Sequence, residues 1–172
     1  VGTVADTGCE TFIVHARKAW LKGLSPKQNR EIPELDYGRV YQLKQDFPDL
    51  EIIINGGITD LEQSKQHLTQ IDGVMIGREA YTNPYLLAEV DQQIYGSENS
   101  MQSRKKVAED FIQYVDNELS QNIKLQSMTR HILGLFHGMP GARQFRRHIS
   151  ENAHQPNATI DVLIEALAKT TG

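Results

Sequence analysis

The first half of the chain alternates short apolar runs with amphipathic stretches. The apolar runs are rich in β-branched residues and predict buried strands at residues 11–17, 51–54 and 74–76. Between and after these runs, the spacing of apolar positions predicts helices at residues 37–46, 60–70 and 85–95. Strands that alternate with helices are typical of consecutive β/α units, so we predict an α/β fold with a parallel sheet.

The second half of the chain changes to a purely helical period. Four apolar stripes predict four short helices, which suggest a small all-α helical bundle. The stripes are Val107, Phe111, Tyr114, Val115 and Leu119; Met128, Ile132, Leu135 and Phe136; Ala142, Phe145 and Ile149; and Ile160, Leu163, Ile164 and Leu167. A polar break at residues 96–100 separates the two patterns. We therefore predict one domain over residues 1–97 and a helical domain over residues 98–172.

Two of the predicted strands end abruptly in glycine, with Gly56 and Gly57 after one and Gly77 after the next. A residue without a Cβ lets the backbone approach a ligand closely and present its N–H groups to an anion. Arg78 follows Gly77 and would add a cation whose forked donors suit phosphate. One such turn is better explained as a tight turn, but two turns and an arginine favour phosphate binding.

Glycine turns after neighbouring strands also match the phosphate site of many (β/α)8 TIM barrels. Three strands cannot close such a barrel, which takes eight strands and typically about 250 residues. The chain has 172 residues and opens at Val1 without a methionine. We therefore expect the C-terminal part of a barrel from a longer protein, whose open sheet edges need a cover such as a second copy.

The composition is that of an ordinary globular protein, with 39% hydrophobic and 23% charged residues. No apolar run approaches the roughly 18 residues that a membrane span needs, so we expect no membrane partner. The single cysteine, Cys9, cannot form an internal disulfide, which suits the cytoplasm. No cluster of His and Cys has the spacing of metal ligands, and we predict no metal site.

The net charge of −4 hides two local basic patches. Residues 11–30 contain five basic residues and no acidic one, and Arg143, Arg146, Arg147 and His148 form a second cluster. The three arginines are at helical spacing, opposite the apolar positions of their predicted helix, so they can point together away from the core. Such patches can mark a polyanion-binding surface on an acidic protein, although they are more often plain solvated surface.

The long connection at residues 18–35 carries most of the first basic patch. Connections longer than about 12–15 residues are usually functional or disordered. Four apolar side chains could pack this connection against the rest of the domain, namely Trp20, Leu21, Leu24 and Ile32. We expect an ordered basic loop over the mouth of the site, the alternative being a mere surface excursion. His15 ends the preceding strand and could hold a phosphate, act as an acid or base, or cap the strand.

Three motifs resemble those of a known family. They are HARKAWLKGLSPKQNREIP at residues 15–33, INGGI at residues 54–58 and GVMIGREAYTNPY at residues 73–85. Together they are similar to the tRNA-dihydrouridine synthases, and specifically to their A-type subfamily. The first motif is long and specific, whereas the other two occur across the flavin-barrel synthases. The resemblance covers essentially the whole chain.

The resemblance implies an FMN-dependent enzyme that uses NADPH to reduce uridines 20 and 20a of the tRNA D-loop to dihydrouridine. It also implies where the cofactor and the tRNA bind. The residues expected at FMN and its phosphate are His15, Asn55, Gly56, Gly57, Gly77 and Arg78. The residues expected to face tRNA are Lys27, Arg30, Arg143, Arg146 and Arg147.

In this family a cysteine protonates C5 of the uracil, and it belongs to the N-terminal half of the protein. The resemblance therefore places this cysteine upstream of the chain. We expect the N-terminal half that carries it to be a partner of this chain. Cys9 lies outside that motif and is expected to be an ordinary small residue. We expect the chain to be inactive alone and to bind FMN weakly or not at all.

Two alternatives stay open from the sequence. The chain could belong to another phosphate-binding barrel enzyme that acts on a small molecule. It could also work as a non-enzymatic RNA-binding module.

Overall fold

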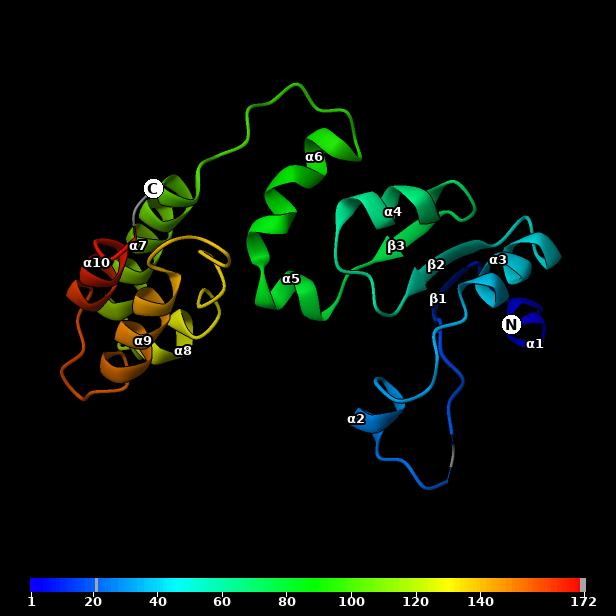
Figure 1. The fold of residues 1–172 in the computed structure, drawn as a ribbon, viewed down its shortest axis with the longest axis horizontal. Helices are drawn as coiled ribbons and strands as arrows, with labels where there is room; N and C mark the ends of the chain where they lie inside the picture. Colours follow the sequence, from blue (N-terminus) through cyan, green and yellow to red (C-terminus); the bar gives the residue numbers. More distant parts are fainter. Residues whose placement is uncertain (21, 171–172) are drawn as a thin grey trace. The chain divides into compact units, whose positions relative to one another are not determined.

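The computed structural model describes residues 1–20 and 22–170, which include a three-stranded parallel sheet (Figure 1). The strands are β1 (Thr11–His15), β2 (Glu51–Asn55) and β3 (Gly73–Met75), in the spatial order β1-β2-β3. Ile54 of the central strand pairs with Val14 on one side and Val74 on the other. The predicted α/β class with parallel pairing is therefore confirmed.

Helices α3 (Tyr37–Asp46) and α4 (Leu61–Leu68) pack against the sheet and follow the predicted ranges closely. Each begins at an aspartate whose carboxylate accepts a backbone N–H: Asp36 caps α3 and Asp60 caps α4. Ile52 and Ile54 of β2 are completely buried beneath these helices. The core of this part of the chain therefore lies on one face of the sheet.

The other face of the sheet is more open. Ile13 of β1 is 52% exposed and Met75 of β3 is 37% exposed. Both point opposite to the buried positions, because successive side chains of a strand alternate between the two faces. The sheet thus presents an apolar face that this unit does not itself cover.

The long connection between β1 and α3 leaves the sheet and carries a single helical turn, α2 (Pro26–Asn29) (Figure 1). Arg17 anchors its base, because the guanidinium donates to the carbonyl of Pro33 and the backbone bridges to Leu35. The prediction that apolar side chains pack this loop down is wrong for Trp20 and Ile32, which are 52% and 54% exposed. Hydrogen bonds between the Asn29 side chain and the Trp20 backbone hold the loop instead of apolar packing. Leu21 lies outside the described residues.

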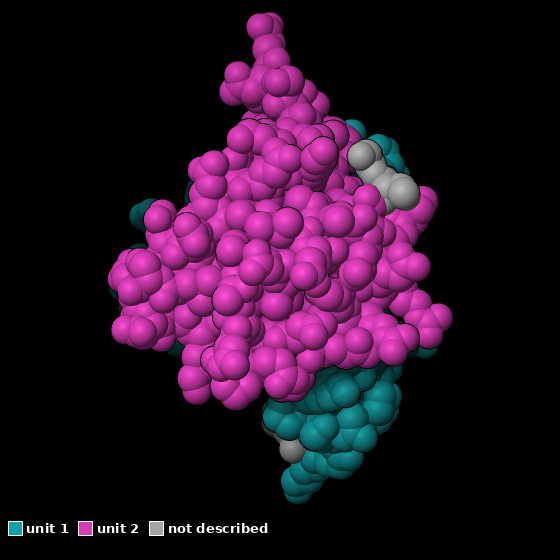
Figure 2. Space-filling model, turned by 90° about the vertical axis from the view of Figure 1, so that its left-hand side faces the viewer, with its two compact units in different colours: residues 1–79 teal, residues 80–172 magenta. Residues whose placement is uncertain are grey.

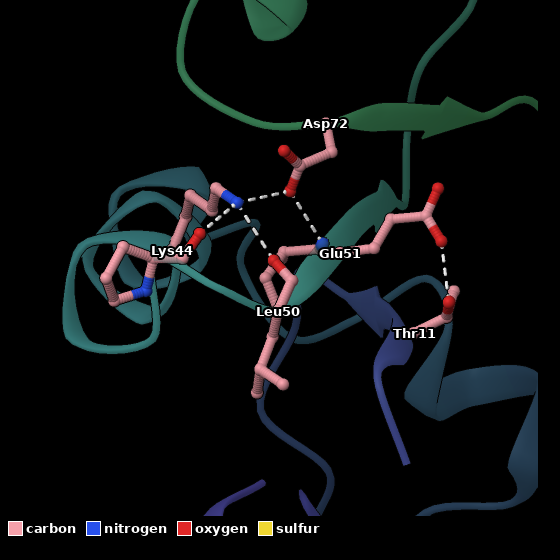
Figure 3. Close-up of polar contacts among 7 residues, drawn as sticks. Thr11, Lys44, Leu50, Glu51 and Asp72 are labelled. Atoms are coloured by element: carbon pink, nitrogen blue, oxygen red, sulfur yellow. Dashed lines mark hydrogen bonds and ion pairs between the residues drawn. The ribbon is translucent and has the colours of Figure 1, made fainter. Parts of the chain in front are cut away.

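A polar cluster joins α3 to the strands (Figure 3). Lys44 of α3 lies 2.8 Å from the carboxylate of Asp72 and also donates to the carbonyls of Pro48 and Leu50. The same carboxylate oxygen accepts the backbone N–H of Ile52 at 2.8 Å. One ion pair therefore connects the helix, the start of β2 and the turn before β3.

The chain divides into two compact units, residues 1–79 and residues 80–172, shown in different colours in Figure 2. The boundary predicted at 97/98 falls inside the second unit. The segment before it packs on the helices that follow: the Tyr85 hydroxyl donates to the Gln102 carbonyl at 2.7 Å, and the Arg104 guanidinium lies 4.0 Å from the Tyr85 ring centroid. These contacts join the segment to the helical unit.

The predicted helix at residues 85–95 is also shorter and less regular than expected. The structure has α5 (Arg78–Thr82), a 3-10 helix η1 (Pro84–Glu89) and a single turn α6 (Val90–Gln93) in this region. A further short turn, α1 (Gly2–Ala5), precedes β1. In the described part of the chain, no helix is both long enough and apolar enough to cross a bilayer.

Four helices of the second unit share one apolar core. They are α7 (Arg104–Ser120), α8 (Leu125–Thr129), α9 (Ala142–Asn152) and α10 (Asp161–Leu167). Val115, Phe145 and Ala166 are almost completely buried between them. The Phe136 and Phe145 rings meet edge to face with their centroids 4.8 Å apart. Each predicted apolar stripe thus contributes to this core.

One of these helices is shorter than its stripe predicts. The pattern from Met128 to Phe136 predicts a continuous helix, whereas α8 ends at Thr129 and turns follow. Hydrogen bonds three residues apart, such as Leu135 N–H to Ile132 O, replace the α-helical ladder. Gly134 explains part of the difference, since glycine costs a helix interior about 1 kcal/mol relative to alanine.

We predict that Asp72→Asn destabilises the chain by about 1 kcal/mol at neutral pH, since it removes the charge that Lys44 faces. Burial opposes ionisation, but the Ile52 N–H and then the Lys44 ammonium lower the pKa of Asp72 below its ordinary value. A lowered pKa gives stability that is present above the unfolded-state pKa and is lost as pH falls through the folded one. The difference should therefore shrink below about pH 4.

Urea unfolding followed by circular dichroism between pH 2.5 and 7 measures this difference. Asp46→Asn is the matched control, because Asp46 is an exposed acid of the same unit and bonds only to Gln42 one helical turn away. Equal destabilisation by Asp72→Asn at every pH would contradict the prediction.

Candidate functional site

A depression of about 580 Å³ lies at the carboxyl ends of the three strands. Parallel strands end at the same edge of a sheet, so the residues that follow them converge there. Residues predicted to hold the cofactor line it: His15, Asn55, Gly56, Gly57, Gly77 and Arg78. The structure therefore brings together all six residues that the sequence assigned to this site.

The turn after β2 requires glycine at two consecutive positions. Gly56 has φ 123° and Gly57 has φ 70°, conformations that other residues adopt only with strain. A Cβ on Gly57 would also lie 2.5 Å from a methyl carbon of Leu35. The Tyr37 hydroxyl donates to the Gly56 carbonyl at 2.9 Å and fixes one side of this peptide. The turn is thus held by residues of the loop and of α3.

Gly77 differs from these glycines. Its φ lies outside the left-handed region, and no atom lies within 4 Å of the place where a Cβ would stand. Neither backbone conformation nor packing within the unit therefore requires glycine at this position. A ligand that approaches the backbone from the depression would require it.

Two arginines, Arg30 and Arg78, and one acidic residue, Glu79, line the depression. Burial lowers the pKa of His15, and the neighbouring guanidinium groups of Arg17, Arg30 and Arg78 lower it further. A histidine with a lowered pKa is neutral at pH 7 and can accept or donate one hydrogen bond. An anion in the depression would face Arg30 and Arg78 and would favour the protonated form of His15.

Two further contacts shape the same site. Arg78 Nη1 lies 3.1 Å from Glu31 Oε1. An acidic residue of the long loop therefore pairs with the arginine that is predicted to bind phosphate. The Asn55 amide donates to the sulfur of Met75 at 3.1 Å, and a thioether is a weak acceptor. A stronger acceptor, such as a carbonyl or phosphate oxygen, would therefore compete well for the Asn55 donor.

Sequence reasoning missed several residues of this site. Four of them line the depression, namely Ile58, Thr59, Met75 and Glu79. Two others, Tyr37 and Glu31, contact its glycine turn and Arg78. Tyr37 begins a predicted helix, and Glu31 lies in a predicted loop, so no local pattern distinguished either of them. Arg30 was predicted to face tRNA, and the structure places it on the lining of the depression, beside His15. Lys27, predicted with it, is exposed on α2.

The three arginines of α9 lie together on the surface. Arg143, Arg146 and Arg147 are exposed, while Phe145 and Ile149 of the same helix are buried. The predicted separation of a basic face from an apolar face is therefore confirmed. An intrahelical ion pair of 2.7 Å joins Arg147 to Glu151 and partly offsets the positive charge of this face.

Other candidate chemistry is sparse in the residues that the structure describes. The Cys9 thiol donates only to the Thr11 carbonyl, at 3.5 Å. Across residues 1–20 and 22–170, no three His, Cys, Asp or Glu side chains gather where they could hold a metal ion.

A basic, glycine-lined depression at the ends of parallel strands is typical of phosphate-binding β/α proteins. The family model described as "Dihydrouridine synthase (Dus)" matches residues 1–171. The chain belongs to the dihydrouridine synthase family.

Curated relatives carry the same family name in several bacteria. A protein of Vibrio cholerae named tRNA-dihydrouridine(20/20a) synthase is 62% identical over 170 residues, which are 98% of this chain and 52% of that protein. Proteins of the same name in Escherichia coli K12 and Yersinia pestis are 58% and 57% identical, over 97% and 98% of this chain and 49% of their own lengths. The chain thus spans about half the length of the curated relatives it matches.

We predict that Gly77→Ala leaves the free energy of unfolding unchanged within about 0.5 kcal/mol, because open space surrounds the added methyl group. The same change should weaken inorganic phosphate binding by roughly tenfold, through the loss of one hydrogen bond to a charged group. Gly57→Ala, the matched variant, should destabilise the fold by about 2 kcal/mol, since it adds strain at positive φ and a clash with Leu35.

Urea unfolding gives the stabilities, and chemical shifts during a phosphate titration detect binding even at millimolar dissociation constants. If Gly77→Ala destabilised the fold as much as Gly57→Ala, the glycine would be needed for folding rather than for a ligand.

Proposed function

We propose that this chain supplies the FMN-phosphate site and a tRNA-binding surface of an enzyme that reduces uridines 20 and 20a of tRNA to 5,6-dihydrouridine with NADPH. The observation that carries the proposal is the convergence of His15, Gly56, Gly57, Gly77 and Arg78 on one basic depression. Membership of the dihydrouridine synthase family and the names of the curated relatives support the choice of reaction.

The depression fits the phosphate end of FMN. The turn at Gly56 and Gly57 carries no side chain that would obstruct an anion, and Gly77 faces space that an added methyl group would fill. Arg30 and Arg78 supply positive charge beside His15. An anion needs these two features, backbone access and fixed cations.

These residues would then share the binding of FMN. The backbone N–H groups of the two glycine turns bind phosphate oxygens, and Arg78 neutralises their charge. His15 donates a hydrogen bond to the phosphate or to the ring system, and the Asn55 amide orients the same group. FMN held there would supply the hydride chemistry of the uracil reduction.

We further propose that the sheet is part of a (β/α)8 barrel completed by the half of the protein that the relatives carry beyond this match. The exposed apolar face at Ile13 and Met75 supports this, because a barrel interior would bury it. The proton donor for C5 belongs to that other half, and Cys9 has no part in the reaction. The single cysteine also supports a cytoplasmic location.

The helical unit would hold the tRNA backbone. Arg143, Arg146 and Arg147 form an exposed cationic face on a helix whose other side is anchored in the core. Such a face binds phosphates without reading bases, and so fixes the position of the tRNA. We propose that residues 98–172 act as the tRNA-binding bundle.

A chimera tests the reaction. We expect residues 1–172, placed in the Vibrio cholerae relative in exchange for the half they match, to give a yellow protein that restores dihydrouridine to unmodified tRNA at positions 20 and 20a in the presence of NADPH. The 172-residue chain alone should bind FMN weakly and reduce no uridine. Mass spectrometry of digested tRNA measures the product. Activity of the chain alone, or a folded chimera with neither flavin nor product, would contradict the proposal.

We predict that replacing Arg143, Arg146 and Arg147 with alanine weakens tRNA binding several-fold. Because each neutralised phosphate releases counterions, the plot of log affinity against log salt concentration should also become flatter. Filter binding at several salt concentrations measures both quantities.

The matched control replaces Lys105, Lys124 and Arg130, three exposed cations of the same unit, and leaves the net charge the same as in the test variant. If both triple variants behaved alike, net charge would explain the loss and the α9 face would not be a binding surface. Unchanged affinity in the first variant would make the α9 arginines solvated surface only.

A further inference from the structure

Trp20 is the only tryptophan of the chain, and 52% of its surface is exposed. Tryptophan is enriched at the energetic centres of binding surfaces, so an indole presented on an exposed basic loop is a candidate contact for a partner. Trp20 belongs to neither the core of its unit nor the lining of the depression. Packing within this unit and the phosphate site therefore leave its position unexplained.

The structure holds the Trp20 backbone in place although its ring is exposed. The Asn29 side chain accepts the Trp20 N–H at 2.7 Å and donates to the Trp20 carbonyl at 2.9 Å. Asn29 itself closes α2, whose first turn has a reciprocal capping box between Ser25 and Gln28. A loop fixed in this way presents the ring at a low cost in conformational entropy when it binds a partner.

The charge around Trp20 defines the kind of partner. Lys18, Lys22 and Lys27 are exposed on the same connection, and residues 11–30 contain no acidic side chain. A protein partner would have to be strongly acidic to face these lysines. A single-stranded nucleic acid offers both complements at once, because its phosphates pair with lysines and its unstacked bases lie on aromatic rings.

We propose that Trp20 is a stacking platform for an unpaired base of the tRNA substrate, with the lysines of the same loop contacting the adjacent phosphates. This inference rests on the proposed function, since it takes tRNA as the partner. It extends that function by giving the long loop a contact to a base, whereas the arginines of α9 contact only the phosphate backbone.

The single tryptophan makes the proposal directly measurable. An unmodified tRNA transcript with uridine at positions 20 and 20a, added to the 172-residue chain, should quench the Trp20 fluorescence as it binds. Trp20→Ala should weaken tRNA binding by about tenfold, because base–aromatic stacking contributes roughly 1–3 kcal/mol. The salt dependence of binding should stay unchanged, since no charge is removed.

Three further variants separate stacking from general effects. Trp20→Phe should retain most of the affinity, because it keeps an aromatic face. Asn29→Ala should give an intermediate loss, since it frees the loop without changing its charge. Tyr95→Ala is the matched control, because Tyr95 is 78% exposed and lies outside the basic segment. It should leave affinity unchanged, and circular dichroism checks that every variant is folded.

The outcomes distinguish this inference from the proposed function. Salt-sensitive tRNA binding with no change in Trp20 fluorescence, and equal affinities of Trp20→Ala and Tyr95→Ala, would overturn the stacking role and leave the function intact. Absence of tRNA binding by the wild-type chain would overturn the stacking role, while the chimera would still test the reaction by its own product.

Discussion

The parallel pairing of β2 with its two neighbours is the constraint on which the site depends. Ile52 and Ile54 are completely buried, which fixes the face of the central strand that points to the helices. Because parallel strands end at one edge, the same register brings His15, Asn55 and the turn at Gly77 around one depression. A shift of one residue would turn the buried isoleucines outward, so burial of the core and assembly of the site are specified together.

The depression combines a backbone that is held tightly with charges that lie close together. Tyr37 and Leu35 fix the glycine turn, so its conformation does not depend on a ligand. Arg17 links the base of the long loop to Pro33, and Glu31 of that loop reaches Arg78. The loop therefore takes part in the electrostatics of the site, and a change in its position would change the charge that a bound phosphate faces.

The helical unit has a simpler design. One side of α9 is buried around Phe145, and the other carries three arginines. Such a division lets a cationic surface remain rigid, since burial of the apolar side offsets the repulsion between like charges. In the function proposed here, one unit recognises a cofactor phosphate and the other the phosphates of tRNA, both through fixed cations.

The sequence by itself determined the features that rest on local pattern. The bounds of α3 and the existence and order of the three strands and the glycine turns follow from apolar spacing and from the absence of Cβ atoms, which act within a few residues. The strand ends differ from the predicted ones by one or two residues. Only the tertiary structure decided which distant residues meet. It placed Arg30 on the lining of the depression and directed the Tyr37 hydroxyl to the Gly56 carbonyl. It left Trp20 exposed. It also joined residues 80–97 to the helical unit through Tyr85 and Arg104. These outcomes depend on contacts between residues far apart in the chain, and no local period in the sequence encodes such contacts.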